Sequence, residues 1–296
     1  MKINHKLMNN NFTNSDISAV KKFLKNKDII LTQSKKVEEF EKKWSRWLGV
    51  KYSTFVNSGS SANYISIAIL KALNKKNEKN EILVPSLTWV SDVNAIIMNG
   101  FKPVFVDIDL NTLSMSPEKV IKKINKKTLA VFITHAQGFN GLNDNLLRQL
   151  KKRNIILVED VCESHGAKHK NKKLGTFGII SNFSFYYAHH MTTIEGGMIS
   201  TNDKKIYELS RIFRSHGMVR ESKNKIFKKQ MKKKYKDLSP QFIFLHPTLN
   251  FRNNEIGAVI GINQLKSLDK NNKDRTKNFK LFLRKLNKEK YWTDFK

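Results

Sequence analysis

The feature that most constrains the fold of this chain is a regular alternation of short apolar segments with longer segments of helical periodicity. The apolar segments are YSTFV (52–56), EILVP (81–85), PVFVD (103–107), LAVFIT (129–134) and IILVE (155–159). Strands that are apolar throughout and separated by helices are typical of a parallel sheet covered by helices on both faces. The sequence therefore predicts an α/β fold with a mostly parallel central sheet.

The segments between these strands carry helix signals. Ser34 can cap a helix that ends at Gly49 and has one apolar face, made of Val37, Phe40, Trp44, Trp47 and Leu48. Further helices are predicted at about 60–73 and 88–99, after Ser116-Pro117, and in DNLLRQLKKR (144–153).

The net charge of +30 raises the alternative of nucleic-acid binding, because a basic surface neutralises phosphates. The lysines are spread over nearly every predicted helix and turn, without interleaved aromatic residues or a known nucleic-acid-binding motif. We therefore predict a solvated basic surface and no nucleic-acid partner. The densest block, 223–236, is a candidate for attracting an anionic ligand.

Two further absences in the sequence narrow the class of protein. No apolar run approaches the roughly 20 residues of a membrane helix, and MKINHKLMNN lacks a secretory pattern, so we expect a cytoplasmic protein without a membrane partner. The single cysteine, Cys162, rules out an internal disulfide, a four-thiolate zinc site and a self-contained iron–sulfur cluster. No metal site is predicted.

The carboxyl ends of parallel strands are where a ligand is expected. NSGSSAN (57–63) follows the first strand and opens a helix, where backbone N–H groups and hydroxyls can hold a phosphate. Asp160 follows the strand 155–159. Each has a plain alternative: Ser-Gly turns are common at helix starts, and Asp160 can simply cap the next turn.

The segment 174–203 contains neither lysine nor arginine, although the chain has 55 such residues. Within it, FSFYYAHHMTTIEGG (183–197) carries the adjacent pair His189 and His190. Their plain interpretation is two satisfied polar residues near a strand end.

Several motifs together resemble the sugar aminotransferase and dehydratase family of the DegT/StrS type, which has the aspartate aminotransferase (type I) fold and uses pyridoxal phosphate. The resemblance runs from about 37 to 268 and is carried by NSGSSAN, VPSLTWVSDVNAI, PVFVDIDLNTLSM, VEDVCESHGA, LGTFG, FSFYYAHHMTTIEGGMIST, RSHGMVRE and LNFRNNEIGAVIGINQL.

The resemblance implies a role for each matching residue. The cofactor phosphate would be held by Gly59, Ser60, Ser61 and Ser184. Trp89 would stack on the pyridine ring, the alternative being core packing. Asp160 would pair with the ring nitrogen, and Glu163 would lie near the ring hydroxyl. Asn250 would reach the phosphate of a neighbouring subunit, which implies a homodimer.

The sequence departs from the family pattern at His189, where ordinary members carry the lysine that forms the internal Schiff base. Imidazole cannot form that imine, but it moves protons well near neutral pH. The sugar 3-dehydratases of this family share the substitution. The resemblance thus implies noncovalent pyridoxal or pyridoxamine phosphate, with His189 as the catalytic base and His190 as an orienting or packing residue.

The implied reaction removes the C3 hydroxyl of a nucleotide-linked 4-keto-6-deoxy sugar, in deoxysugar and surface-polysaccharide biosynthesis. Because Cys162 is alone, the resemblance is closer to the cluster-free colitose-pathway type than to the branch with an iron–sulfur reductase partner. In that type, the substrate is GDP-linked and an amino acid such as glutamate recharges the cofactor. Arg214, His216 and Arg220 are candidate anion or sugar contacts.

The family normally continues after the INQL helix into a small carboxy-terminal domain. We therefore predict a large cofactor-binding domain at 1–265 and the start of a largely missing small domain at 266–296. The alternatives are a sugar aminotransferase that uses Lys168 or Lys170, an inactive homologue that only binds, and a nucleic-acid-binding protein.

Overall fold

The computed structural model of the protein describes residues 10–74 and 78–295. Its helices are α1 (Asn14–Leu24), α2 (Lys35–Leu48), α3 (Gly59–Leu73), α4 (Val90–Met98), α5 (Pro117–Lys123), α6 (Asp144–Lys152), α7 (Lys204–Arg214), α8 (Lys225–Lys234), α9 (Glu255–Gln264) and α10 (Leu268–Lys285). Its strands are β1 (Tyr52–Val56), β2 (Glu81–Pro85), β3 (Lys102–Val106), β4 (Thr128–Thr134), β5 (Ile156–Asp160), β6 (Lys168–His169), β7 (Lys172–Lys173), β8 (Ile180–Ser184) and β9 (Gly197–Thr201).

The central sheet has seven strands in the order β1-β9-β8-β5-β4-β2-β3. Strands β8, β5, β4, β2 and β3 are parallel to one another, and β9 is antiparallel to both of its neighbours. The predicted mostly parallel sheet is therefore confirmed. A short hairpin, β6–β7, forms a separate two-stranded sheet.

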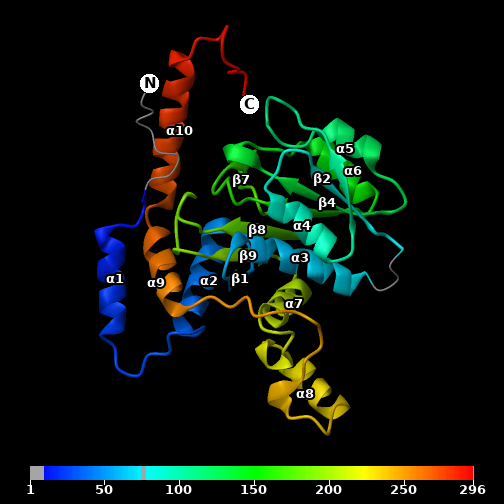
Figure 1. Ribbon diagram of the computed structural model, residues 1–296, viewed down its shortest axis with the longest axis vertical. Helices are drawn as coiled ribbons and strands as arrows, with labels where there is room; N and C mark the ends of the chain where they lie inside the picture. Colours follow the sequence, from blue (N-terminus) through cyan, green and yellow to red (C-terminus); the bar gives the residue numbers. More distant parts are fainter. Residues whose placement is uncertain (1–9, 75–77, 296) are drawn as a thin grey trace.

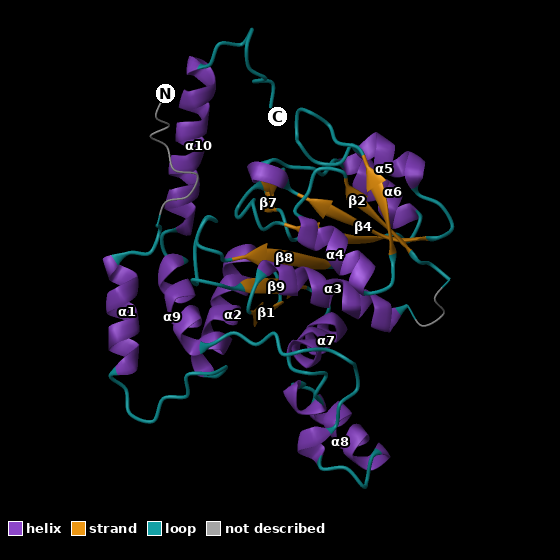
Figure 2. Cartoon of the chain, viewed as in Figure 1, coloured by secondary structure: helices purple, strands orange, loops and turns teal. Residues whose placement is uncertain are grey.

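Helices cover both faces of this sheet (Figure 2). Side chains alternate between the faces along each strand, so Leu83 and Val131 join one hydrophobic core and Ile82 and Ala130 the other. The first core is completed by residues of α2, α5 and α6, and the second by residues of α3, α4 and α7. This double burial explains why the strands are apolar throughout.

Helix α2 begins and ends where the sequence predicts, but its amino end is capped differently. Ser34 is the N-cap residue and makes no side-chain capping bond. The carboxylate of Glu255 accepts instead from the backbone N–H groups of Ser34, Lys36 and Val37 at 2.7–2.9 Å. Gly49 ends the helix in the left-handed conformation with φ of 94°.

The carboxyl ends of the parallel strands converge on one edge of the sheet, where loops lead into α3 and α4. This edge brings together segments from five separate parts of the sequence, and it positions the predicted site. Helix α10 extends away from the sheet, and the α8 region lies at the opposite end of the molecule (Figure 1). The division into domains at 265/266 stays a prediction. No helix in the described ranges is both long and apolar enough to cross a membrane.

Candidate cofactor and catalytic site

The first part of the site is the amino end of α3, which directly follows β1. Ser58 caps the helix by accepting from the N–H of Ser61 at 3.0 Å. No hydrogen bond between described residues uses the N–H of Gly59 or Ser60. These free donors at a helix amino end, beside an exposed Ser60, could hold a phosphate group.

Glycine at position 59 is required by close packing rather than by its backbone angles. A Cβ atom at Gly59 would lie 2.6 Å from the Cβ of Ser184 and 3.1 Å from the Sγ of Cys162. The turn therefore contacts the end of β8 and the residue after β5 directly. The predicted phosphate residues Gly59, Ser60, Ser61 and Ser184 are thus gathered in one place.

Asp160, the last residue of β5, is buried and held by two donors. Its Oδ1 accepts from the N–H of Cys162 at 2.8 Å, and its Oδ2 accepts from the Nδ2 of Asn63 at 2.9 Å. Asn63 lies on α3, and its Nδ2 is also 2.6 Å from Asp92 Oδ1 on α4. The predicted capping contact to Cys162 exists, but it is one part of a network that fixes this carboxylate.

Trp89 and Glu163 flank this region from two loops. Trp89 immediately precedes α4 and is 67% exposed, so the alternative of core packing is wrong. Glu163 accepts from the N–H of Gln137 through its Oε2 at 3.0 Å. Gln137 has a φ of 53°, an unusual value for a residue with a side chain, and it aims that N–H at the carboxylate.

His189 and His190 lie in the loop between β8 and β9, and a third imidazole joins them. His165, in the loop after β5, is buried, with its ring centroid 5.0 Å from that of His190 and 6.2 Å from that of His189. The N–H of His189 donates to the carbonyl of Tyr186 at 3.0 Å. The three rings form what we call the imidazole cluster: His165, His189 and His190.

Burial keeps the imidazole cluster uncharged. It lowers the pKa of His190 to about 3, and it lowers the pKa of His165 well below the ordinary value with the help of the neighbouring rings. Burial also lowers the pKa of His189, which the negative charge of Asp160 partly offsets. His189 is therefore a neutral imidazole within the electrostatic influence of Asp160, which is the form a proton acceptor needs.

The remaining predicted contacts are Asn250, which precedes a residue that contacts the phosphate turn through Asn57, and the pair His216 and Arg220. Asn250 is exposed, and its Oδ1 accepts from the N–H of Arg252 at 3.0 Å. His216 and Arg220 are also exposed, and no hydrogen bond between described residues joins them to Asp160, Ser184 or His189. A second subunit at Asn250, and a substrate at His216 and Arg220, stay predictions.

Arg214 is enclosed in the core of the protein. It is fully buried, and its Nη1 lies 2.6 Å from Glu41 Oε1 and donates to the carbonyl of Phe55 at 3.0 Å. The guanidinium thus joins α7 to α2 and β1. This position supports the fold around the first strand and presents no surface to a ligand.

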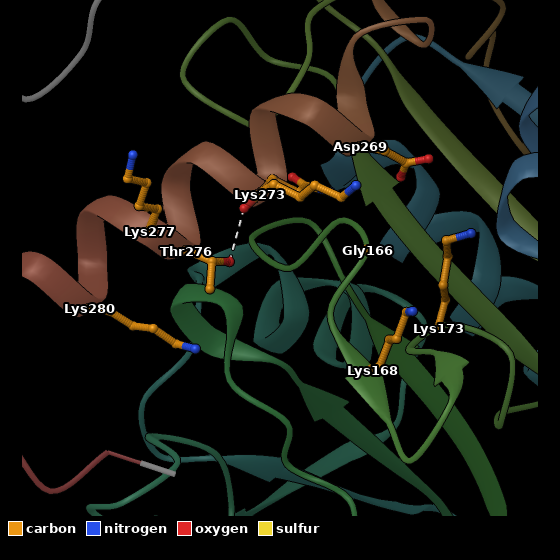
Figure 3. Close-up of a pocket in the computed structure, with 9 residues that line it drawn as sticks. Gly166, Lys168, Lys173, Asp269, Lys273, Thr276, Lys277 and Lys280 are labelled. Atoms are coloured by element: carbon orange, nitrogen blue, oxygen red, sulfur yellow. Dashed lines mark hydrogen bonds between the residues drawn. The ribbon is translucent and has the colours of Figure 1, made fainter.

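Lys168 and Lys170, the lysines of the aminotransferase alternative, lie on and next to the β6–β7 hairpin. Lys170 pairs with Asp144 at 2.6 Å and its side chain is 69% exposed. Lys168 lines a pocket of about 690 Å³ between the hairpin and α10, which we call the lysine pocket (Figure 3). The pocket is lined by Gly166, Lys168, Lys173, Asp269, Asn272, Lys273, Thr276, Lys277 and Lys280. Neither lysine hydrogen-bonds to or pairs with Asp160, Ser184 or His189 within the described part of the chain.

The site also contains a single thiol, Cys162, which lies beside the Gly59 turn. Burial raises the pKa of the Cys162 thiol well above its ordinary value, and the charge of Asp160 adds to this effect. Cys162 is therefore a neutral thiol that packs under the Gly59 turn. Across residues 10–74 and 78–295, no cluster of three or more His, Cys, Asp or Glu residues could hold a metal ion.

Three residues of the site were not predicted from the sequence. Asn63 and Asp92 lie inside the motifs NSGSSAN and VPSLTWVSDVNAI, and His165 lies inside VEDVCESHGA, but no role was predicted for them. The available signal was a polar residue at an otherwise apolar helix position, as at Asp92. Their convergence depends on which strands are neighbours in the sheet.

These residues fit pyridoxal phosphate. Free N–H groups and a small-residue turn suit the phosphate, a buried and oriented carboxylate suits a pyridinium nitrogen, and an exposed indole suits an aromatic ring. The site combines an anion-binding helix end, a buried carboxyl group held in a hydrogen-bond network and a neutral imidazole at the carboxyl edge of a parallel sheet. That combination defines a cofactor-dependent enzyme of the aminotransferase fold.

Comparison with known proteins agrees with this class. The model of the DegT/DnrJ/EryC1/StrS aminotransferase family matches residues 10–294, and the chain belongs to this family. It is 34% identical over 293 residues to the GDP-4-keto-6-deoxy-D-mannose 3-dehydratase of Escherichia coli O55:H7, covering 98% of this chain and 74% of that one. It is 37% identical over 183 residues to the GDP-perosamine synthase of Escherichia coli O157:H7, covering 62% of this chain and 49% of that one.

A solved structure supports the same family and fold. A GDP-4-keto-6-deoxymannose-3-dehydratase with a trapped PLP-glutamate geminal diamine superposes with a TM-score of 0.79 at 32% identity, over 90% of this chain and 69% of that one. The prediction of the family and of its aminotransferase-type fold is confirmed. The relatives include both dehydratases and enzymes of amino-sugar synthesis, so the choice between these reactions depends on the residues of the site.

Proposed function

We propose that this protein is a pyridoxal- or pyridoxamine-phosphate-dependent sugar 3-dehydratase. Its substrate is a nucleotide-linked 4-keto-6-deoxy sugar, with a GDP-linked 4-keto-6-deoxymannose as the first candidate, and glutamate recharges the cofactor. The single observation that carries this proposal is a neutral imidazole, His189, at the family's lysine position and within the influence of Asp160. The similarity to a GDP-4-keto-6-deoxymannose 3-dehydratase, in sequence and in structure, supports it.

Each residue of the site has a separate role in holding the cofactor. Gly59, Ser60 and Ser184 hold the phosphate, Trp89 covers one face of the ring, and Asp160 pairs with the ring nitrogen. When bound, the cofactor supplies an electron-withdrawing ring that accepts electrons from an adjacent carbon. Asp160 would face the ring nitrogen with a carboxyl group that the Nδ2 of Asn63 and the N–H of Cys162 hold in place.

His189 moves the proton. Because burial keeps its ring neutral, one ring nitrogen is free to accept a proton near neutral pH. A lysine at this place would form a covalent link to the cofactor, and an imidazole does not, so the cofactor is held noncovalently. His190 is more deeply buried than His189 and packs against His165, which fits an orienting role.

The proposal is tested by turnover of GDP-4-keto-6-deoxymannose with pyridoxamine phosphate and glutamate. We expect a 3-deoxy sugar product by mass spectrometry, together with ammonia release. His189→Asn should reduce turnover at least about 100-fold, because general base catalysis typically contributes this much. His169→Asn, an imidazole of the β6–β7 hairpin, is the matched control and should leave turnover within about twofold. Formation of a 4-amino sugar without any 3-deoxy product would show an aminotransferase instead.

A further inference from the structure

A buried polar triangle lies beneath the site, between α4 and β4. Asp92 is fully buried, and its Oδ2 lies 2.6 Å from the hydroxyl of Thr88 and 2.6 Å from the hydroxyl of Thr134. The two hydroxyl oxygens are themselves 2.7 Å apart. Each of the three oxygens is therefore at hydrogen-bond distance from the other two.

The number of protons decides the charge of this triangle. Three short contacts between oxygens require three hydrogen atoms, and the two threonine hydroxyls supply only two. If Asp92 were ionised, one pair of oxygens would face each other at 2.6–2.7 Å with no hydrogen between them. A proton on Asp92 Oδ2 completes a ring in which every oxygen donates once and accepts once.

The surroundings of the triangle favour the same state. Asp92 Oδ1 and Asp160 Oδ2 share the Nδ2 of Asn63, at 2.6 Å and 2.9 Å, so two carboxyl groups lie side by side in the interior. No ion pair between described residues includes either of them. Burial raises the pKa of Asp92 well above its usual range, and the charge of Asp160 raises it further. Two such neighbours do not ionise together.

The proton belongs to Asp92 rather than to Asp160. Both oxygens of Asp160 already accept from N–H donors, and the side chain also meets the carboxyl group of Asp92 and the thiol of Cys162. Asp92 Oδ2, in contrast, has two hydroxyl oxygens within reach. The donor and acceptor pattern thus distinguishes the two carboxyl groups.

We propose that Asp92 is a positioning residue that is protonated at neutral pH, so that Asn63 can bridge the two carboxyl groups and Asp160 remains the single anion of this pair. The protonation state follows from the triangle alone. Its consequence, a carboxylate reserved for the ring nitrogen of the cofactor, rests on the proposed function.

The direct test compares unfolding of the wild type and Asp92→Asn across pH, using the full chain. Asn is a neutral isostere of the protonated acid. The folded wild type binds one more proton than the unfolded chain at any pH between about 4 and the raised pKa, so its stability falls as pH rises. The unfolding constant of the wild type relative to Asp92→Asn should therefore increase about tenfold per pH unit, or about 100-fold between about pH 5 and 7.

The control is Asp144→Asn. The neighbouring Lys170 lowers the pKa of the exposed Asp144, so this residue is ionised in both states above about pH 5. Its difference from the wild type should show no slope in the same range. The same flat difference for Asp92→Asn, with that variant less stable than the wild type, would overturn the proposal, because it is the behaviour of an ionised Asp92.

Infrared spectroscopy on the wild type gives a second measurement that does not need a folded variant. At about pH 8 the spectrum should retain one carbonyl stretch of a protonated carboxylic acid, which is sensitive to deuterium exchange and absent from Asp92→Asn; absence of the band from the wild type would contradict the proposal. Asp92→Asn should also keep its affinity for pyridoxamine phosphate within about threefold, whereas Asp160→Asn loses at least tenfold. Equal loss of affinity in both variants would contradict the proposal, because Asn at position 92 reproduces the protonated acid and should leave the carboxyl group of Asp160 in place. If no 3-deoxy sugar forms, the proposed function fails while the proton measurements still stand.

Discussion

The imidazole cluster and the lysine pocket meet at one loop, but they differ in the burial and the charge of their basic side chains. His165 is buried against His190, and the next residue, Gly166, lines the lysine pocket. In the cluster, burial keeps three imidazoles neutral. In the pocket, Lys168 of the hairpin and the lysines of α10 remain exposed to solvent, whereas Lys173 is half-buried and burial lowers its pKa (Figure 3).

The difference shows what the segment without lysine or arginine contributes. An ammonium group cannot give up its charge at neutral pH without a large shift in its pKa, whereas an imidazole needs only a small one. A chain with a net charge of +30 can thus keep this part of its interior free of cations by using histidine there and lysine outside. The site gains neutral bases without a buried positive charge.

The largest expected effect comes from exchanging the two kinds of residue. His165→Lys places an ammonium among Trp44, Phe183 and Phe185, whose rings contact His165 and provide no counter-charge. We expect a loss of about 3–5 kcal/mol in the free energy of unfolding, measured with urea. Lys168→His, the reverse exchange in the lysine pocket, should change it by less than about 0.5 kcal/mol. Equal changes in the free energy of unfolding for the two variants would contradict the difference between the two regions.

A smaller effect is expected from pH. Because the pKa of folded His165 lies below that of the unfolded chain, the folded state binds fewer protons, and its stability is lost as pH falls below about 6.5. Between about pH 6.5 and 5, His165 should lower the free energy of unfolding by about 2 kcal/mol. The measurement is the unfolding free energy of the wild type minus that of His165→Asn across this range. A difference independent of pH would contradict this account, because it would show that the pKa of His165 is the same in the folded and unfolded states.

Much of the fold was predictable because its signals are local. Apolar runs of five to seven residues gave β2, β4 and β5, and Gly49 marked the end of α2. The antiparallel direction of β9 was not predictable, since GMIST reads like any other buried strand. The capping of α2 by Glu255 could not be predicted either, because that carboxylate is more than 200 residues away in the sequence.

The site residues that lie in contiguous sequence motifs were predicted. Those that only the fold brings together were missed. Gly59, Asp160 and His189 each belong to a segment whose residue types indicate their chemistry. The triangle of Thr88, Asp92 and Thr134 needs α4 to lie against β4, and its short contacts arise only from the order of the strands. Proton positions inside such networks follow from distances, which a sequence does not contain.

The central claim is that His189 leaves the cofactor without a covalent link, and borohydride reduction measures this most directly. The full chain is incubated with pyridoxal phosphate, reduced, and weighed by mass spectrometry. We predict no added pyridoxyl mass on the wild type and a single addition on His189→Lys, located at residue 189. A stoichiometric addition to the wild type, at Lys168, Lys170 or any other lysine, would contradict the account.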